Sequence, residues 1–148
     1  MTRDTGASIH ATAVLAGDRA ILIRGPSGSG KSRLAFDLIL AGRAGVISPT
    51  ALIGDDRVYL DRQQGAVRVR GATELAGKIE VRGLGIRSTV SVPEGNVGLV
   101  VDLAAGDAER LPPPEAFVTN LLGAEIPRIP VAAEHAPLPL VLAFLTTT

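Results

Sequence analysis

Residues 25–32 read Gly-Pro-Ser-Gly-Ser-Gly-Lys-Ser and fit the phosphate-binding pattern G-x-x-x-x-G-K-[ST]. The glycines allow the backbone to wrap a phosphate with successive N–H groups pointing inward. We expect Lys31 to reach the β- and γ-phosphates of a nucleotide and the Ser32 hydroxyl to bind Mg²⁺. The alternative interpretation is a glycine-rich turn with a structural role only. The predicted nucleotide-contacting residues are Gly25, Pro26, Ser27, Gly28, Ser29, Gly30, Lys31 and Ser32.

The elements expected on either side of this segment suit a phosphate site. Residues 7–16 and residues 20–24, the first four of which are apolar, predict two strands of an antiparallel hairpin that leads into the segment. From residue 31 to residue 41, apolar side chains recur at helical spacing, and Gly42 is expected to end this helix. The positive end of the helix dipole would then add to the same anion site.

Two adjacent acids, Asp55 and Asp56, follow the apolar run of residues 51–54. A carboxylate at the carboxyl end of a strand faces the ligand crevice, where Mg²⁺ and an attacking hydroxyl both need one. One acid could lie near the metal while the other accepts a proton from the hydroxyl, as a kinase requires. The residues alone do not say which acid does which, and a solvated turn is the alternative interpretation.

The rest of the chain is expected to be rich in β-structure. Strands are predicted at residues 57–61, 66–70, 78–82, 86–92 and 97–103, the last of them central and covered on both faces. Residues 115–122 predict a short helix, and residues 126–131 an edge strand or loop because of their prolines. We therefore expect an α/β protein with a mixed β-sheet core and packed helices, forming a single domain over residues 1–148.

Composition excludes several classes of partner. Fifteen basic residues balance fifteen acidic ones in 148 residues. The chain therefore lacks the excess of positive charge expected of a protein that binds nucleic acid or an anionic membrane. The chain has no cysteine, and hence no disulfide framework or thiolate nucleophile. The apolar run at residues 138–145 is interrupted by Pro139 and is too short for a bilayer, which needs about 20 residues. We expect a soluble, cytoplasmic protein.

Three further segments, together with the phosphate-binding pattern, resemble the catalytic domain of bacterial HPr kinase/phosphorylase. They are His10, Leu52-Ile-Gly-Asp-Asp-Arg-Val58 and Ile79-Glu-Val-Arg-Gly-Leu-Gly-Ile86, and the resemblance runs in order from His10 to Val131. It implies this family's P-loop-containing catalytic-domain fold. It also implies a serine kinase that uses ATP and Mg²⁺ to phosphorylate HPr, the phosphocarrier of the bacterial phosphotransferase system, and that assembles as a hexamer.

The resemblance also assigns roles near the acids. In the family the strand-edge aspartates contain the catalytic base, which falls here on Asp55 and Asp56; Asp56 is favoured and both are retained. His10 corresponds to a catalytic-site histidine that would orient or tune the aspartate. Without the family, a lone histidine on an apolar strand would be interpreted as a packed core residue.

The remaining roles concern the metal and the phosphoryl charge. Glu80 aligns with the family's second Mg²⁺ ligand and would complement Ser32, with Asp55 as a further candidate. Arg82 could stabilise the transferring phosphoryl group or pair with Glu80. Arg110 resembles an active-site arginine of the family, although Pro112 replaces a glycine there and a salt-bridged surface arginine is an equal alternative.

The chain also departs from the family. It begins almost at the catalytic strand, so we expect no N-terminal regulatory domain, and the family's C-terminal docking helices are expected to be lacking. Ala-Ala-Glu-His135 follows Val131 where the family has a Gly-Arg-Asn segment, which argues against the reverse, phosphorylase reaction. The alternatives are an ATP-binding or ATPase regulatory module, and a small-molecule kinase; no arginine-rich lid supports the latter.

Overall fold

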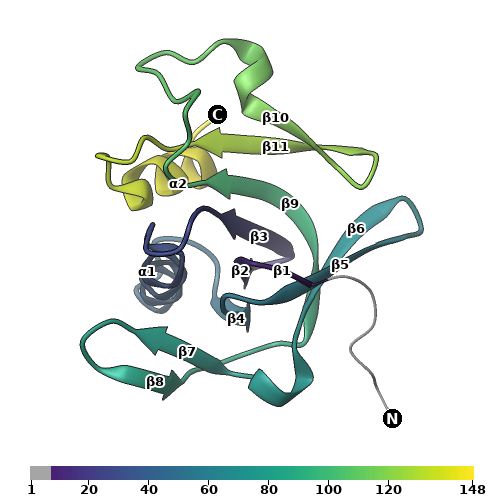
Figure 1. Ribbon diagram of the computed structural model, residues 1–148, viewed down its shortest axis with the longest axis vertical. Coiled ribbons are helices and arrows are strands. Elements are labelled where there is room, and N and C mark those ends of the chain that lie inside the picture. The colour runs from purple at the N-terminus through teal and green to yellow at the C-terminus, as the bar shows by residue number, and fades with distance from the viewer. Residues whose placement is uncertain (1–7) are drawn as a thin grey trace.

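The computed structural model describes residues 8–148 (Figure 1). The strands are β1 (Ser8–Ile9), β2 (Ala11–Ala16), β3 (Arg19–Arg24), β4 (Thr50–Gly54), β5 (Val58–Gln63), β6 (Ala66–Gly71), β7 (Lys78–Val81), β8 (Gly85–Ser88), β9 (Glu94–Asp102), β10 (Val118–Leu121) and β11 (Ala124–Pro130). The α-helices are α1 (Lys31–Arg43) and α2 (Pro137–Thr146), and two 3₁₀ turns, η1 (Thr73–Leu75) and η2 (Pro114–Phe117), complete the elements.

The main sheet is mixed. Its strand order over the described residues is β1-β5-β6-β9-β3-β2-β4, with β11 joined to the second half of β9 and β10 joined to β11. Strand β9 pairs in parallel with β3 and with β11, whereas β2 is antiparallel to both β3 and β4. Strands β3, β4, β9 and β11 therefore all end at the same edge, and the arrows of β3, β9 and β11 point the same way in Figure 1. The predicted mixed sheet with helices is confirmed.

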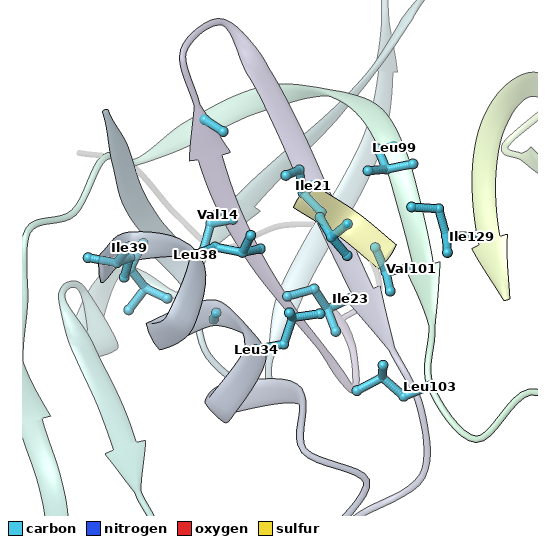
Figure 2. Packing of buried hydrophobic residues seen from close by; sticks show 14 of the residues in the cluster. Val14, Ile21, Ile23, Leu34, Leu38, Ile39, Leu99, Val101, Leu103 and Ile129 are labelled. Atoms are coloured by element: carbon cyan, nitrogen blue, oxygen red, sulfur yellow. The ribbon is translucent and has the colours of Figure 1, made fainter. Parts of the chain in front are cut away.

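Alternating side chains of the central strands build a core on each face of the sheet. Val14, Ile21 and Ile23 lie beneath α1, whose Leu34, Leu38 and Ile39 contact them, and Leu99, Val101 and Val141 continue the same cluster (Figure 2). Ala13, Ala20 and Leu22 point to the other face and pack with side chains from β5, β6 and β10. The two-residue period fixes β3 in register, so the segment that follows it starts from a rigid strand.

Helix α1 is longer than predicted, because Gly42 does not end it. Gly42 lies within the helix, and a Cβ atom there would stand only 2.8 Å from the backbone nitrogen of Thr50. The glycine thus permits close packing of the helix on the start of β4. Gly45, with φ +78°, follows the C-cap residue and takes the left-handed conformation that terminates helices.

Several predicted elements have other bounds or another type in the structure. The strand predicted at residues 7–16 is interrupted at His10, which separates β1 from β2; residue 7 lies outside the described residues. The helix predicted at residues 115–122 is wrong beyond η2, because residues 118–121 form β10. Residues 126–131, predicted as an edge strand or loop, contribute to β11, which pairs with β10 over residues 124–127 and with β9 over residues 128–130. The strand predicted at residues 86–92 shortens to β8, which pairs with β7.

Helix α2 was not predicted. Pro137 lies in its first turn, where the missing N–H group has no intrahelical acceptor, so proline is tolerated. Val141 is fully buried in the core beside α1. The absence of the family's C-terminal docking helices stays a prediction. Over the part of the chain that is described, no helix has the length and apolar character to cross a membrane.

Candidate functional site

Residues 25–30, called here the glycine loop, connect the end of β3 to the start of α1. Gly28 and Gly30 have φ values of +83° and +100°, a region that side-chain-bearing residues rarely adopt. Lys31 is 7% exposed, and its Nζ atom donates to the carbonyl oxygens of Gly25 at 2.9 Å and Pro26 at 3.2 Å. The ammonium group is thus held inside the curve of the loop, at the amino end of α1.

The hydroxyl of Ser29 bears on whether the glycine loop suits a polar ligand. A Cβ atom at Gly25 would lie 2.5 Å from Ser29 Oγ, so only glycine leaves room for this hydroxyl. Ser29 Oγ is buried and has no hydrogen-bond partner within residues 8–148. Buried polar atoms without partners are uncommon in folded proteins. The loop therefore has the unsatisfied polarity expected where a phosphate-bearing ligand completes the hydrogen bonding.

Asp55 joins three parts of the site. Its Oδ1 atom accepts hydrogen bonds from Ser32 Oγ at 2.6 Å and Thr12 Oγ1 at 3.0 Å, and its Oδ2 atom accepts one from the backbone N–H of Glu80 at 2.9 Å. The predicted neighbourhood of Ser32 and Asp55 is thus present in the structure. A hydroxyl and a carboxylate oxygen side by side are the donor types that Mg²⁺ prefers, with water and substrate phosphates completing its shell.

Asp56 is placed differently from its neighbour. Its backbone has φ +64°, a strained conformation for a residue with a side chain, and its N–H donates to Thr12 Oγ1 at 3.0 Å. Its side chain is 65% exposed and lies 3.9 Å from Nδ1 of His10, which is itself 88% exposed. His10 is therefore not a core residue, and it lies beside the acid as the resemblance implied. Thr12, which sequence reasoning missed, contacts both acids.

The hairpin of β7 and β8 brings the backbone of Glu80 and the side chain of Arg82 to the site. Glu80 reaches Asp55 through its backbone N–H group, while its side chain is exposed. The Nη2 atom of Arg82 lies 3.8 Å from the position that a Cβ atom of Gly28 would take, so the guanidinium stands over the glycine loop. Over residues 8–148, no three histidine or acidic side chains form a ready metal cage, which leaves Ser32 and Asp55 as the paired oxygen donors.

Arg110 is not brought to these residues. It is exposed in the segment between β9 and η2, and no hydrogen bond or ion pair within the described residues joins it to the glycine loop or the acids. Its predicted catalytic role has no contact in this structure to support it.

The comparisons with known proteins agree with these features. Residues 4–133 match the family model described as the HPr serine kinase C-terminal domain. The chain belongs to this family. The HPr kinase/phosphorylase of Mycoplasma mycoides subsp. mycoides SC is 32% identical over an alignment of 127 residues, and the match covers 76% of this chain and 38% of that protein. The HPr kinase/phosphorylase of Geobacillus thermodenitrificans is 30% identical over an alignment of 111 residues, and that match covers 70% of this chain and 34% of that protein.

This member of the HPr serine kinase family therefore spans little more than a third of the curated relatives it matches. Among solved structures, the HPr(Ser) kinase/phosphatase from Coxiella burnetii superposes with a TM-score of 0.74 at 23% identity. The match covers 94% of this chain and 87% of that one, so the two share a fold. The resemblance to the family is confirmed.

A second polar cluster, also missed from sequence, fixes the start of the glycine loop in this family member. Arg24 donates to Asp102 from Nε at 2.7 Å and from Nη2 at 2.8 Å, and Nε of Arg128 donates to the same carboxylate at 2.6 Å. Burial raises the pKa of Asp102, but the hydrogen bonds from the two arginines outweigh burial and lower it. The signal available in the sequence was an acid after the apolar run of β9, as Asp55 follows the apolar run of β4.

Proposed function

We propose that the chain is the catalytic part of an ATP- and Mg²⁺-dependent protein serine kinase whose acceptor is HPr. One observation carries the proposal: Asp55 is bonded to Ser32 of the phosphate-binding pattern, while the adjacent Asp56 stays exposed beside His10. Two carboxylates with different surroundings suit the two tasks of phosphoryl transfer, placing charge near the metal and accepting a proton. Family membership supports the choice of HPr as acceptor.

In this mechanism the glycine loop and Lys31 hold the phosphates of ATP. The N–H groups of the loop bind the phosphate oxygens, and the buried ammonium of Lys31 neutralises charge on the transferring group. A bound Mg²⁺ would neutralise further phosphate charge, with Ser32 and Asp55 as its ligands and Glu80 as an additional candidate. In this proposal Arg82, whose Nη2 atom lies near Gly28, stabilises the same charge.

Asp56 is the general base in this proposal. Its carboxylate is accessible, so a serine hydroxyl of the acceptor can approach it, and it accepts the hydroxyl proton as the oxygen attacks the phosphoryl group. Thr12 fixes the backbone of Asp56 through the N–H group, and His10 lies close enough to orient the carboxylate. Asp55 is less suited to this role because three hydrogen bonds already engage its oxygens.

Transfer of label from γ-labelled ATP to purified HPr tests the proposal. We expect transfer by the wild-type chain, and a loss of at least about 100-fold in Lys31→Ala and Asp56→Asn, in line with the contribution of positioned charges and bases. Asp18→Asn makes the same change of acid to amide in the exposed turn between β2 and β3 and should keep wild-type transfer. No transfer by the wild type, or full transfer by Lys31→Ala, would refute the proposal.

The second candidate is a module that binds or hydrolyses ATP without transfer to HPr. The segment after β11, residues 132–135, favours it because the Gly-Arg-Asn expected from the family is replaced there. ATP hydrolysis with no labelled HPr would select this candidate. The same substitution predicts that inorganic phosphate will not release label from phosphorylated HPr. Hexameric assembly and a cytoplasmic location stay predictions, and light scattering tests the first of them.

A further inference from the structure

The carboxyl edge of the sheet has two sides, with the glycine loop between them. Asp55 and Asp56 follow β4, which lies beyond β2 on one side of β3. Leu103 follows β9 and Val131 follows β11, on the other side of β3. Figure 1 shows this second side, where the ends of β9 and β11 approach α2. A ligand held by the loop must therefore extend toward the acids, toward these two strand ends, or in both directions.

A cavity of about 270 Å³ occupies the second side. The glycine loop forms one wall through residues 26–29, and residues 103–104, residues 131–133 and Pro137 form the others. These side chains are apolar apart from the loop serines. Within the described chain, His135 is the one titratable side chain that lines the cavity. Apolar side chains lie here beside polar groups of the backbone and the loop serines, and a recess of roughly 300 Å³ that combines both can hold part of a small molecule.

Hydrogen bonds hold the walls of this cavity to the sheet. The N–H of Leu103 donates to the carbonyl of Arg24 at 2.8 Å, directly before the glycine loop. The N–H of Val131 donates to the backbone carbonyl of Asp102 at 2.8 Å, and the N–H of Ala105 donates to the carbonyl of Val131 at 2.9 Å. The turn that carries His135 is closed by a bond from its N–H to the carbonyl of Ala132 at 3.0 Å. These hydrogen bonds fix the walls of the cavity relative to the sheet.

The direction of phosphoryl transfer decides which part of the reactants belongs here. The attacking and leaving oxygens lie roughly in line on opposite sides of the transferred phosphorus. In the proposed function, on which this step rests, Asp56 accepts the proton of the attacking hydroxyl, so the acceptor comes from the β4 side. The leaving nucleoside diphosphate must then lie on the β9 and β11 side. We propose that the cavity binds the nucleoside, base and ribose, of the phosphate donor.

The chemistry of the walls fits a nucleoside better than a peptide acceptor. A flat heteroaromatic base gains from apolar contact with Leu103 and the alanines, and the imidazole of His135 offers a face for stacking. No acidic side chain lines the cavity within residues 8–148, so nothing there repels the phosphates that follow the ribose. The triphosphate then passes over residues 27–29 to reach Lys31 and Ser32.

Calorimetric titration of the full chain with ATP and with inorganic tripolyphosphate, each with Mg²⁺, separates the nucleoside from the phosphates. Ala133 lines the cavity and is exposed at its mouth, so Ala133→Leu obstructs the cavity without disturbing the core. Ala136→Leu makes the same change one turn away, at an exposed residue that does not line the cavity, and is the matched control.

We expect the wild type to bind ATP more tightly than tripolyphosphate. Ala133→Leu should weaken ATP binding by about tenfold or more, the usual effect of mismatched bulk in an apolar pocket, with tripolyphosphate unchanged. Ala136→Leu should change neither ligand. Equal affinities for ATP and tripolyphosphate in the wild type, or unaltered ATP affinity in Ala133→Leu, would overturn the assignment. If Ala133→Leu raises only the KM for HPr, the cavity belongs to the acceptor and the assignment is wrong. Failure of the wild type to bind either ligand would instead remove the proposed function itself, and the nucleoside subsite with it.

Discussion

Thr12 links the two acids, and its replacement by valine removes that link with little change in shape. The side chain is fully buried. Its hydroxyl donates to Asp55 Oδ1 at 3.0 Å and accepts from the N–H of Asp56 at 3.0 Å. Valine keeps the branched shape but places a methyl group where the hydroxyl lies. Both hydrogen bonds are lost together, while Asp55 keeps its bonds from Ser32 and from the backbone of Glu80.

The expected cost follows from these contacts. A hydrogen bond to a charged group contributes about 1.5–3 kcal/mol and one to a backbone N–H about 1 kcal/mol. The added methyl group returns about 0.8 kcal/mol of hydrophobic stabilisation. Thr12→Val should therefore lower the free energy of unfolding by about 2 kcal/mol. Because Asp56 loses the bond that holds its φ of +64°, phosphoryl transfer should fall by at least about tenfold more than nucleotide affinity.

Urea denaturation measures the stability, and the labelled-ATP assay with a parallel nucleotide titration measures the second effect. Thr12→Ser is the control, because it keeps the hydroxyl and loses only the methyl group; it should retain most of the transfer rate. A free energy of unfolding for Thr12→Val within about 0.5 kcal/mol of the wild-type value, the range of neutral surface changes, would contradict this role of Thr12. So would an equal loss of transfer in Thr12→Ser and Thr12→Val.

Three further predictions concern single positions. Gly42→Ala should destabilise the fold by about 1–2 kcal/mol in urea despite alanine's helix propensity, because its Cβ would lie 2.8 Å from the Thr50 nitrogen; a gain in stability would contradict this packing. The lowered pKa of Asp102 stabilises the fold above the ordinary value of 3.8, and this contribution is lost as pH falls through the folded value. Unfolding followed from pH 6 to pH 2 should therefore show a smaller acid loss in Asp102→Asn than in the wild type, and parallel curves would refute the assignment. His10→Gln should slow phosphoryl transfer by roughly tenfold while ATP affinity stays constant, as expected of a residue that acts on Asp56; weakened ATP binding would place His10 elsewhere.

Local patterns were enough to predict the parts of the site that are continuous in the chain. The glycine loop, the strand before it and α1 lie within about 25 residues, and each has its own signal. Asp55 was predicted because an acid after an apolar run is also a local pattern. Thr12 was missed because its bond to Asp55 joins residues 43 positions apart, and a threonine in a strand has no distinctive spacing. Its role depends on the register of β2 against β4.

The elements predicted wrongly or missed in the second half of the chain have a similar explanation. Residues 118–121 alternate too briefly to distinguish a strand from a helix, and pairing with residues 124–127 decides the matter. Leu122 and Gly123, with φ values of +51° and +86°, form the tight turn of this hairpin, and the glycine was the signal available. Helix α2 was hidden by its prolines, which are harmless in a first turn. Contacts made across the sheet, rather than propensity, determine these elements.

The central position of β9 also has a consequence for how the chain folds. Arg24, directly before the glycine loop, pairs with Asp102, 78 residues later in the chain. Contacts of such separation close slowly, because a long loop must be ordered before they are gained. A nascent chain synthesised only as far as β8 would hold the whole phosphate-binding sequence and both acids, yet lack β9, the parallel neighbour of β3. The region around the glycine loop is therefore completed late in synthesis, only after β9 has emerged and paired with β3.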